Sequence, residues 1–388
     1  MLQSPPLELL WRRRRQGALH LPRSQGYGSA ERGGCRVVVQ SCVLIRRVRL
    51  KEIRRNNHFV PKLYLKQWAQ DGRIPTYQLL VSHEAMPEWR EISLSKIAFR
   101  QHLYTYALAK EETDEFEHWL AQEFENPAVD AIDRVVREQR LTPEHWRRLV
   151  RFAVSQSVRT PAWFKSFVAR QQKELPALVQ ETLEKSVQEL EKRVAAKLPL
   201  PASPAKDALF PSKVIVQRGS DGQGAIGVET VVGRQLWLWT MRNILSTTIE
   251  RIPTDKWNIL RAPDGLSWPT SDDPLIRLNY RGPTEYDFGG GWGVKNTDIF
   301  LPLSPKHLLH TCIRGPGWPR GATVDKERAQ FLRRIILEHA DRYVFSRDKA
   351  EVSLIRPRTV SLAAFNQESA FWAGWRDEQL QAERDLQA

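Results

Sequence analysis

Cysteine, methionine and long apolar runs are scarce in this sequence of 388 residues. The three cysteines, Cys35, Cys42 and Cys312, are too few for a disulfide framework and lack the spacing of a zinc site. No apolar run approaches the roughly 20 residues that a membrane-spanning helix needs. These absences argue against a disulfide-rich secreted protein and a membrane partner, and they predict a cytoplasmic location.

The sequence also lacks the familiar catalytic signatures. It contains no Gly-x-Ser-x-Gly, His-Glu-x-x-His or Cys–His arrangement. The glycine-rich segment 289–293 is not followed by the Gly-Lys-Ser/Thr of a phosphate-binding loop. Any active site must therefore be built from less recognisable residues.

Most of the chain lacks a strong excess of one charge, although the net charge is +14. Residues 1–55 hold 13 of the 59 Lys and Arg residues but only 3 of the 45 Asp and Glu residues. The rest of the chain therefore has 46 basic and 42 acidic residues. A nucleic-acid partner is possible, but the charge of the core does not support one. Nothing in the sequence indicates an oligomeric state.

Residues 1–55 form a basic leader that includes the run Arg12–Arg15. No apolar core of about 7–15 residues follows this run, so the segment does not match a signal peptide. We predict a disordered or spuriously translated extension, with true initiation near Val48. A basic nucleic-acid arm and an organelle-targeting segment are the alternatives.

The remaining chain has a globular composition, with 41 % hydrophobic and 27 % charged residues. We predict one large domain over residues 56–366, with a linker region near 199–212 that contains several prolines. Residues 367–388 are predicted to form a C-terminal helix with a frayed tail.

Helix signals dominate the middle of the chain. Thr142 and Pro143 give a cap followed by a first-turn proline, and the helix they open is expected to run toward Arg159. Thr160–Pro161 should kink or stop it, and a long charged helix should then continue to about Lys197. A further helical block is predicted over Ile226–Ile249.

Strand signals are short and separated by Asp, Pro and Gly turns. They include Thr76–Val81, Trp257–Leu260, Leu275–Leu278 and Ile299–Leu301. We therefore predict an α+β fold that is predominantly helical, with a small antiparallel sheet.

Four polar segments stand out against these elements and occur at residues 58–65, 156–161, 270–274 and 301–305. They read His-Phe-Val-Pro with a later Tyr-Leu, then Gln-Ser-Val-Arg-Thr-Pro, Thr-Ser-Asp-Asp-Pro and Leu-Pro-Leu-Ser-Pro. In this order they resemble the motifs of the bacterial domain-of-unknown-function family 4238 (DUF 4238). The resemblance implies a shared fold and brings no established activity.

His58, Gln156 and Arg159 are the first candidate site residues. A neutral imidazole at His58 suits a catalytic base or a metal ligand; alternatively, the ring packs at a helix entry. Gln156 and Arg159 lie three apart, so a helix would place them on one face, where they can bind a phosphate or carboxylate of a substrate. The alternative for Arg159 is an internal salt bridge to a loop acid.

Ser271, Asp272 and Asp273 are the second candidate group. Adjacent carboxylates are tolerated when a cation neutralises them, so we nominate both aspartates as catalytic, Asp272 with His58 as metal ligands, and Ser271 as substrate-binding. Turn chemistry ahead of Pro274 is the alternative. The joint hypothesis is that His58, the catalytic candidate Arg159 and one aspartate converge on a pocket around a divalent metal.

Glu117 and Glu125 are acidic residues of an amphipathic segment, and we predict a solvated helix edge there. Two functions stay open. One is a metal-assisted hydrolase acting on a phosphodiester or a similar anionic substrate. The other is a non-enzymatic helical module that binds a protein or nucleic-acid partner.

Overall fold

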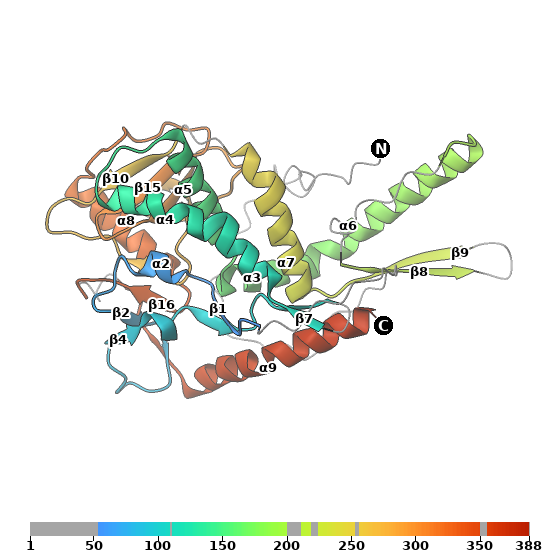
Figure 1. The fold of residues 1–388 in the computed structure, drawn as a ribbon, viewed down its shortest axis with the longest axis horizontal. Helices are drawn as coiled ribbons and strands as arrows, with labels where there is room; N and C mark the ends of the chain where they lie inside the picture. The colour runs from blue at the N-terminus through green and yellow to red at the C-terminus, as the bar shows by residue number, and fades with distance from the viewer. Residues whose placement is uncertain are drawn as a thin grey trace. The chain divides into compact units, whose positions relative to one another are not determined.

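The computed structural model describes residues 53–108, 111–199, 211–218, 224–252, 256–349 and 355–387 (Figure 1). Most of the predicted leader and of the predicted linker region lies outside these ranges. The chain divides into two compact units. The described part of unit 1 comes from Val168–Leu236 with the last few residues, and unit 2 comprises Ile45–Phe167 and Trp237–Arg384.

The largest sheet of unit 2 has five antiparallel strands in the order β10-β15-β14-β12-β13. Their bounds are Asn258–Arg261 (β10), His307–Cys312 (β15), Thr297–Pro302 (β14), Ile276–Gly282 (β12) and Glu285–Asp287 (β13). Helix α8 (Lys326–His339) packs its apolar residues, among them Ile335 and Ile336, against Phe300 and Leu308 of this sheet. Asp325 caps that helix by accepting a hydrogen bond from the Arg328 amide.

A second, four-stranded antiparallel sheet follows the order β11-β16-β2-β4. Its strands are Thr270–Ser271 (β11), Tyr343–Phe345 (β16), Arg73–Gln78 (β2) and Trp89–Ser93 (β4). Four further sheets have two strands each. They pair Asn56–His58 (β1) with Phe99–Gln101 (β5), Leu80–Val81 (β3) with Thr359–Val360 (β17), Tyr106–Leu108 (β6) with Glu111–Thr113 (β7), and, in unit 1, Lys213–Arg218 (β8) with Gly224–Glu229 (β9).

The remaining helices follow several of the predicted boundaries. They are Lys62–Leu65 (α2), Glu115–Leu120 (α3), Asn126–Val136 (α4), Pro143–Gln156 (α5), Pro161–Ala195 (α6), Arg234–Asn243 (α7) and Leu362–Gln387 (α9). The start of α5 is confirmed, because Thr142 and His145 form a reciprocal capping box ahead of Pro143. The predicted break at Thr160–Pro161 is also confirmed. No helix in the described ranges is long and apolar enough to cross a membrane.

The prediction of a predominantly helical fold with one small sheet is wrong. The described residues form a mixed α+β structure with six sheets of two to five strands, and one pair, β3 with β17, is parallel. The strands that the prediction lacked include β1, β4 and β16, which are too short to show a clear period. The predicted helix over Ile226–Ile249 begins too early, because Ile226 lies in β9.

Candidate functional site

Arg159 is the centre of the polar structure in unit 2 and lies in the turn between α5 and α6. Its side chain has no exposed surface. One terminal nitrogen donates to Glu125 Oε1 at 2.7 Å, and the other donates to the backbone oxygen of His58 at 2.8 Å. The Tyr104 hydroxyl donates to the Arg159 backbone oxygen at 2.7 Å. Arg159 therefore forms an internal ion pair, as in the predicted alternative, although Glu125 lies in a helical turn and not in a loop.

The next residue, Thr160, connects this turn to the acidic motif. Its hydroxyl donates to Asp273 Oδ1 at 2.9 Å. His339, the last residue of α8, has Nε2 at 3.8 Å from Asp273 Oδ2 and Nδ1 at 2.9 Å from the Asp273 backbone oxygen. Burial raises the pKa of Asp273, although the neighbouring His339 acts in the opposite direction. Asp273 thus joins the α5–α6 turn to the end of α8.

Asp272 has both carboxylate oxygens occupied by backbone amides. The amide of Asp341 donates to one oxygen at 3.0 Å, and the amide of Arg342 donates to the other at 2.9 Å. Burial raises the pKa of Asp272 to about 7, and the negative charge of Asp341 adds to this shift. Ser271 Oγ accepts from the Asp273 amide at 3.2 Å, which is the predicted turn chemistry.

His58 contributes its backbone to Arg159 and packs its ring into the protein. The ring centroid lies 5.5 Å from that of Phe99. Burial, followed by the positive charge of Lys62, lowers the pKa of His58 to about 4, so the imidazole is neutral at pH 7. Its Nε2 is buried and has no hydrogen-bond partner among the described residues.

Gln156 is close to Arg159 in sequence, but it forms no hydrogen bond with the motif residues among those the structure describes. It is fully buried, and its Nε2 donates to Ser155 Oγ at 3.2 Å. Helix α5 ends at Gln156, so the expected helical face shared with Arg159 does not form. The prediction placed both residues in one helix, whereas Arg159 lies in the turn after it.

Glu117 and Glu125 lie beside Arg159, although the sequence did not indicate them as site residues. Glu125 pairs with Arg159 at its position in a π-helical turn, Ala121–Glu125, and turns of this kind occur often at functional sites. Burial raises the pKa of Glu117 to about 7, with Arg159 opposing and Glu125 reinforcing the shift. The prediction of a solvated edge is wrong for Glu117, and no local sequence pattern signals the π turn that positions Glu125.

The nominated metal ligands do not fit a divalent cation. Within the part of the chain that the structure describes, no group of three or more His, Cys, Asp and Glu side chains is arranged to hold a metal ion. Both oxygens of Asp272 already accept amide hydrogens, and the side chain is buried, so little of it is open to a cation. His58 and Asp272 therefore supply no ready coordination sphere.

We call His58, Arg159, Thr160, Asp272 and Asp273 the motif network. Arg159 contacts the first family-like segment and Thr160 contacts the third, so three of the four segments meet in it. Asp272 has 5 % of its surface exposed and Arg159 has none. A dissolved substrate reaches these two groups only if the protein moves, whereas a structural role needs no movement.

Comparison with known protein families gives a match over most of the chain. Residues 56–350 match the family described as "Protein of unknown function (DUF4238)". No curated protein and no solved structure matches the chain. The match covers most of the chain and confirms the resemblance seen in the motifs, so the chain belongs to the DUF4238 family of proteins of unknown function.

Proposed function

We propose that this protein is a non-enzymatic binding module for a protein partner. Unit 2 is then the scaffold, with the motif network buried inside it, and unit 1 carries the contact surface. The observation that carries the proposal is a group of exposed apolar side chains on α6, β8 and β9. Exposed apolar surface of this kind is typical of interaction sites.

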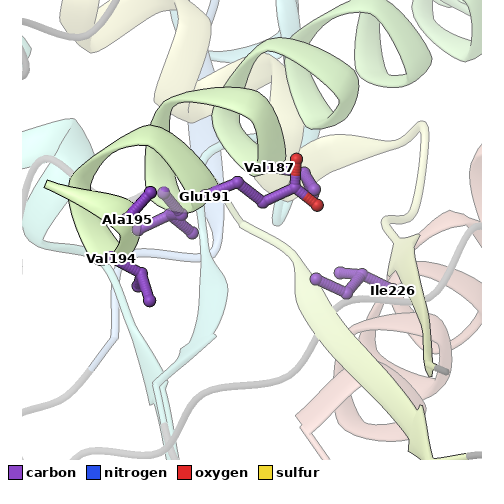
Figure 2. Close-up of a pocket in the computed structure, with 6 residues that line it drawn as sticks. Val187, Glu191, Val194, Ala195 and Ile226 are labelled. Carbon is purple, nitrogen blue, oxygen red and sulfur yellow. The ribbon is translucent and has the colours of Figure 1, made fainter. Parts of the chain in front are cut away.

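An apolar groove of about 420 Å³ lies in unit 1 between α6 and β9. Figure 2 shows the side chains of α6 on one side and Ile226 of β9 on the other. The groove is lined by Val187, Leu190, Glu191, Val194, Ala195 and Ile226. Val194 is 68 % exposed, and Leu198 and Val216 beside these elements are 55 % and 62 % exposed. Water covers these side chains unless a partner does, and covering them is favourable.

The chemistry of the groove favours protein over nucleic acid. Nucleic-acid affinity comes mainly from Lys and Arg that contact phosphates. The lining of the groove contains no cation, and its one charged residue is the acid Glu191. A protein surface with apolar side chains matches this lining better than a phosphate backbone does.

An enzymatic role is the second candidate, and Glu117 is the observation that favours it. This carboxyl group has a pKa of about 7, lies close to Arg159, and has an Oε2 without a hydrogen-bond partner among the described side chains. A carboxyl group with such a pKa suits proton transfer, and an arginine suits an anionic substrate. The limited exposure of the motif network argues against this candidate.

Photo-crosslinking of the full chain in its native cells tests the binding proposal. A photoreactive amino acid at Val194 should give a protein adduct, whereas the same group at Lys192, on the opposite face of α6, should not. The adduct should disappear when Leu190 is also changed to Ser. The proposal fails if Val194 and Lys192 give the same pattern.

A hydrolysis assay tests the enzymatic candidate. Wild type and Glu117→Gln are incubated with bis-p-nitrophenyl phosphate and with Mg²⁺, Mn²⁺ or Zn²⁺. We expect no turnover above the rate without protein. Turnover that Glu117→Gln abolishes, while the variant keeps its circular dichroism spectrum, would establish an enzyme and contradict a purely binding role.

We also propose a cytoplasmic location. Cys312 has a free, buried thiol, and burial, with the charge of Asp298, raises its pKa to about 11. A reducing compartment suits a chain with three cysteines and no disulfide framework. Fractionation of native cells checks this placement.

A further inference from the structure

The part of α6 that lines the groove carries an apolar stripe with heptad spacing. Leu183, Val187, Leu190 and Val194 follow one another at intervals of four, three and four residues. This spacing places them along one face of the helix, and it is the pattern by which one helix packs against another. Three of the four, all except Leu183, line the groove.

The charges beside this stripe are acidic on one flank. Glu184 and Glu191 each follow a stripe leucine by one position, so they lie on the same side of it. Glu191 lines the groove and has no hydrogen bond or ion pair among the described residues. Within the described ranges, Glu184 accepts only from the neutral amide of Gln180, at 2.7 Å. No cation of the described residues therefore pairs with the carboxylates of this flank.

The other flank is different, with Ser186 and Arg193 at the equivalent positions. Arg193 already pairs with Glu189 at 2.8 Å, within the same helix. It therefore does not compensate the acids across the stripe. Charge complementarity points to Lys or Arg on the occupant of the groove.

A second copy of this chain would match these flanks poorly. In an antiparallel pair, the flank that carries Glu184 and Glu191 faces its own copy, and the carboxylates repel. In a parallel pair, Glu191 faces Ser186 of the copy, and no ion pair forms. Self-association therefore gains nothing from charge, whereas a foreign basic helix does.

We infer that the groove binds an amphipathic helix of another protein, with apolar side chains at heptad spacing flanked by Lys or Arg. The inference deepens the proposed function and rests on it. The apolar stripe supplies the burial, in the manner of helix-in-groove recognition. The acidic flank gives specificity for a basic partner, and binding should therefore be weaker at high salt.

Two helical peptides of about three heptads test the inference against the full chain. Both carry the same apolar stripe, and one has Lys and the other Glu at the flanking positions. Fluorescence anisotropy should show at least tenfold tighter binding of the Lys peptide, with a smaller difference in 0.5 M salt. Glu191→Lys should reduce this preference severalfold, and Glu84→Lys, an exposed change of the same charge in unit 2, should not.

The outcomes separate the inference from the function on which it rests. Equal binding of both peptides would overturn the role of the acidic flank, and no binding of either would overturn the helical partner. In both cases the Val194 adduct still reports whether a protein docks here. A dimer in sedimentation, with Val194 crosslinked to its own copy, would overturn the inference in favour of self-association.

Discussion

At the scale of single residues, Arg159 is a buried cation whose partners come from distant parts of the chain. Glu125 is 34 positions away and His58 is 101 positions away. Burial alone would lower the pKa of Arg159, but the nearby Tyr104, Glu125 and Glu117 raise it instead. The guanidinium therefore stays charged, and its hydrogen bonds connect its own segment with those of His58 and Glu125.

Arg159→Ala should lower the free energy of unfolding by about 3–5 kcal/mol, because it leaves the Glu125 carboxylate and the His58 carbonyl without their donor. Urea unfolding followed by tryptophan fluorescence measures this loss. The control is Arg134→Ala, which removes an ion pair with Asp130 whose side chains are 38 % and 55 % exposed and should cost below about 1 kcal/mol. A loss for Arg159→Ala no larger than for the control would refute the structural role.

Glu117 should make stability depend on pH in a defined direction. The pKa is raised from 4.5 to about 7 in the folded state, so between these values the folded protein binds the proton more tightly than the unfolded chain. This contribution to stability is full below pH 4.5 and is lost as the pH rises through 7. Gln cannot ionise, so Glu117→Gln should not show this loss. The free energy of unfolding of the variant should therefore rise by roughly 1–3 kcal/mol relative to wild type between pH 5 and pH 7.5.

The comparison between wild type and variant is necessary because His58 acts in the opposite direction. Its pKa is lowered from 6.5 to about 4, so its contribution is full above pH 6.5 and is lost as the pH falls through 4. The two slopes partly cancel in the wild type. A difference between wild type and Glu117→Gln that stays constant from pH 5 to pH 7.5 would show that Glu117 does not titrate in this range.

At the scale of elements, the clearest local device is the start of α5. Thr142 Oγ1 accepts from the His145 amide at 3.4 Å, and His145 Nδ1 accepts from the Thr142 amide at 3.0 Å. His145 Nε2 lies 2.9 Å from Asp130 in α4, so the cap also connects two helices. The first turn of α5 is thus stabilised locally, without contacts from the motif residues at the other end of the helix.

Thr142→Ala should lower the free energy of unfolding by about 1 kcal/mol, because it removes the cap acceptor for the His145 amide. Chemical denaturation again gives the value. Ser369→Ala is the matched control, since it removes an exposed hydroxyl within α9, where alanine is a good helix former. If both variants lose the same stability, the cap is not the cause.

Secondary structure was predictable where such local signals exist. Thr142–Pro143 and Pro161 mark the starts of α5 and α6, because caps and prolines act on the backbone next to them. The sheets were underestimated because strands such as β4 and β16 are too short for a clear period, and because β9 contains residues that were assigned to a helix. The π turn that carries Glu125 has no local signal.

At the scale of the whole molecule, the charge is concentrated near the N-terminus. Residues 1–55 hold 13 basic and 3 acidic side chains, whereas the rest of the chain is close to balance. Weak, non-specific binding to nucleic acid follows the number of cations that meet phosphates. We therefore expect any such binding to come mainly from the leader.

Replacing Arg12–Arg15 by serine in the full chain should weaken binding to a random DNA duplex about tenfold or more in 0.1 M salt, and it should reduce the salt dependence. Four cations on the surface of unit 2, Lys96, Arg137, Lys295 and Lys326, are changed to serine in the control. Filter binding across a salt series measures both. An equal loss in the control would place the phosphate contacts on the folded core.

The charge distribution, the first turn of α5, the break before α6 and the family could all be predicted from the sequence, because each depends on residue identity or on neighbours within a few positions. Which groups meet depends instead on how the helices and sheets pack. Thr160 reaches Asp273 across 113 positions, whereas Gln156, only three residues before Arg159, donates to Ser155 instead. Such contacts arise when apolar surfaces of helices and sheets pack, and packing brings polar side chains together irrespective of their separation along the chain.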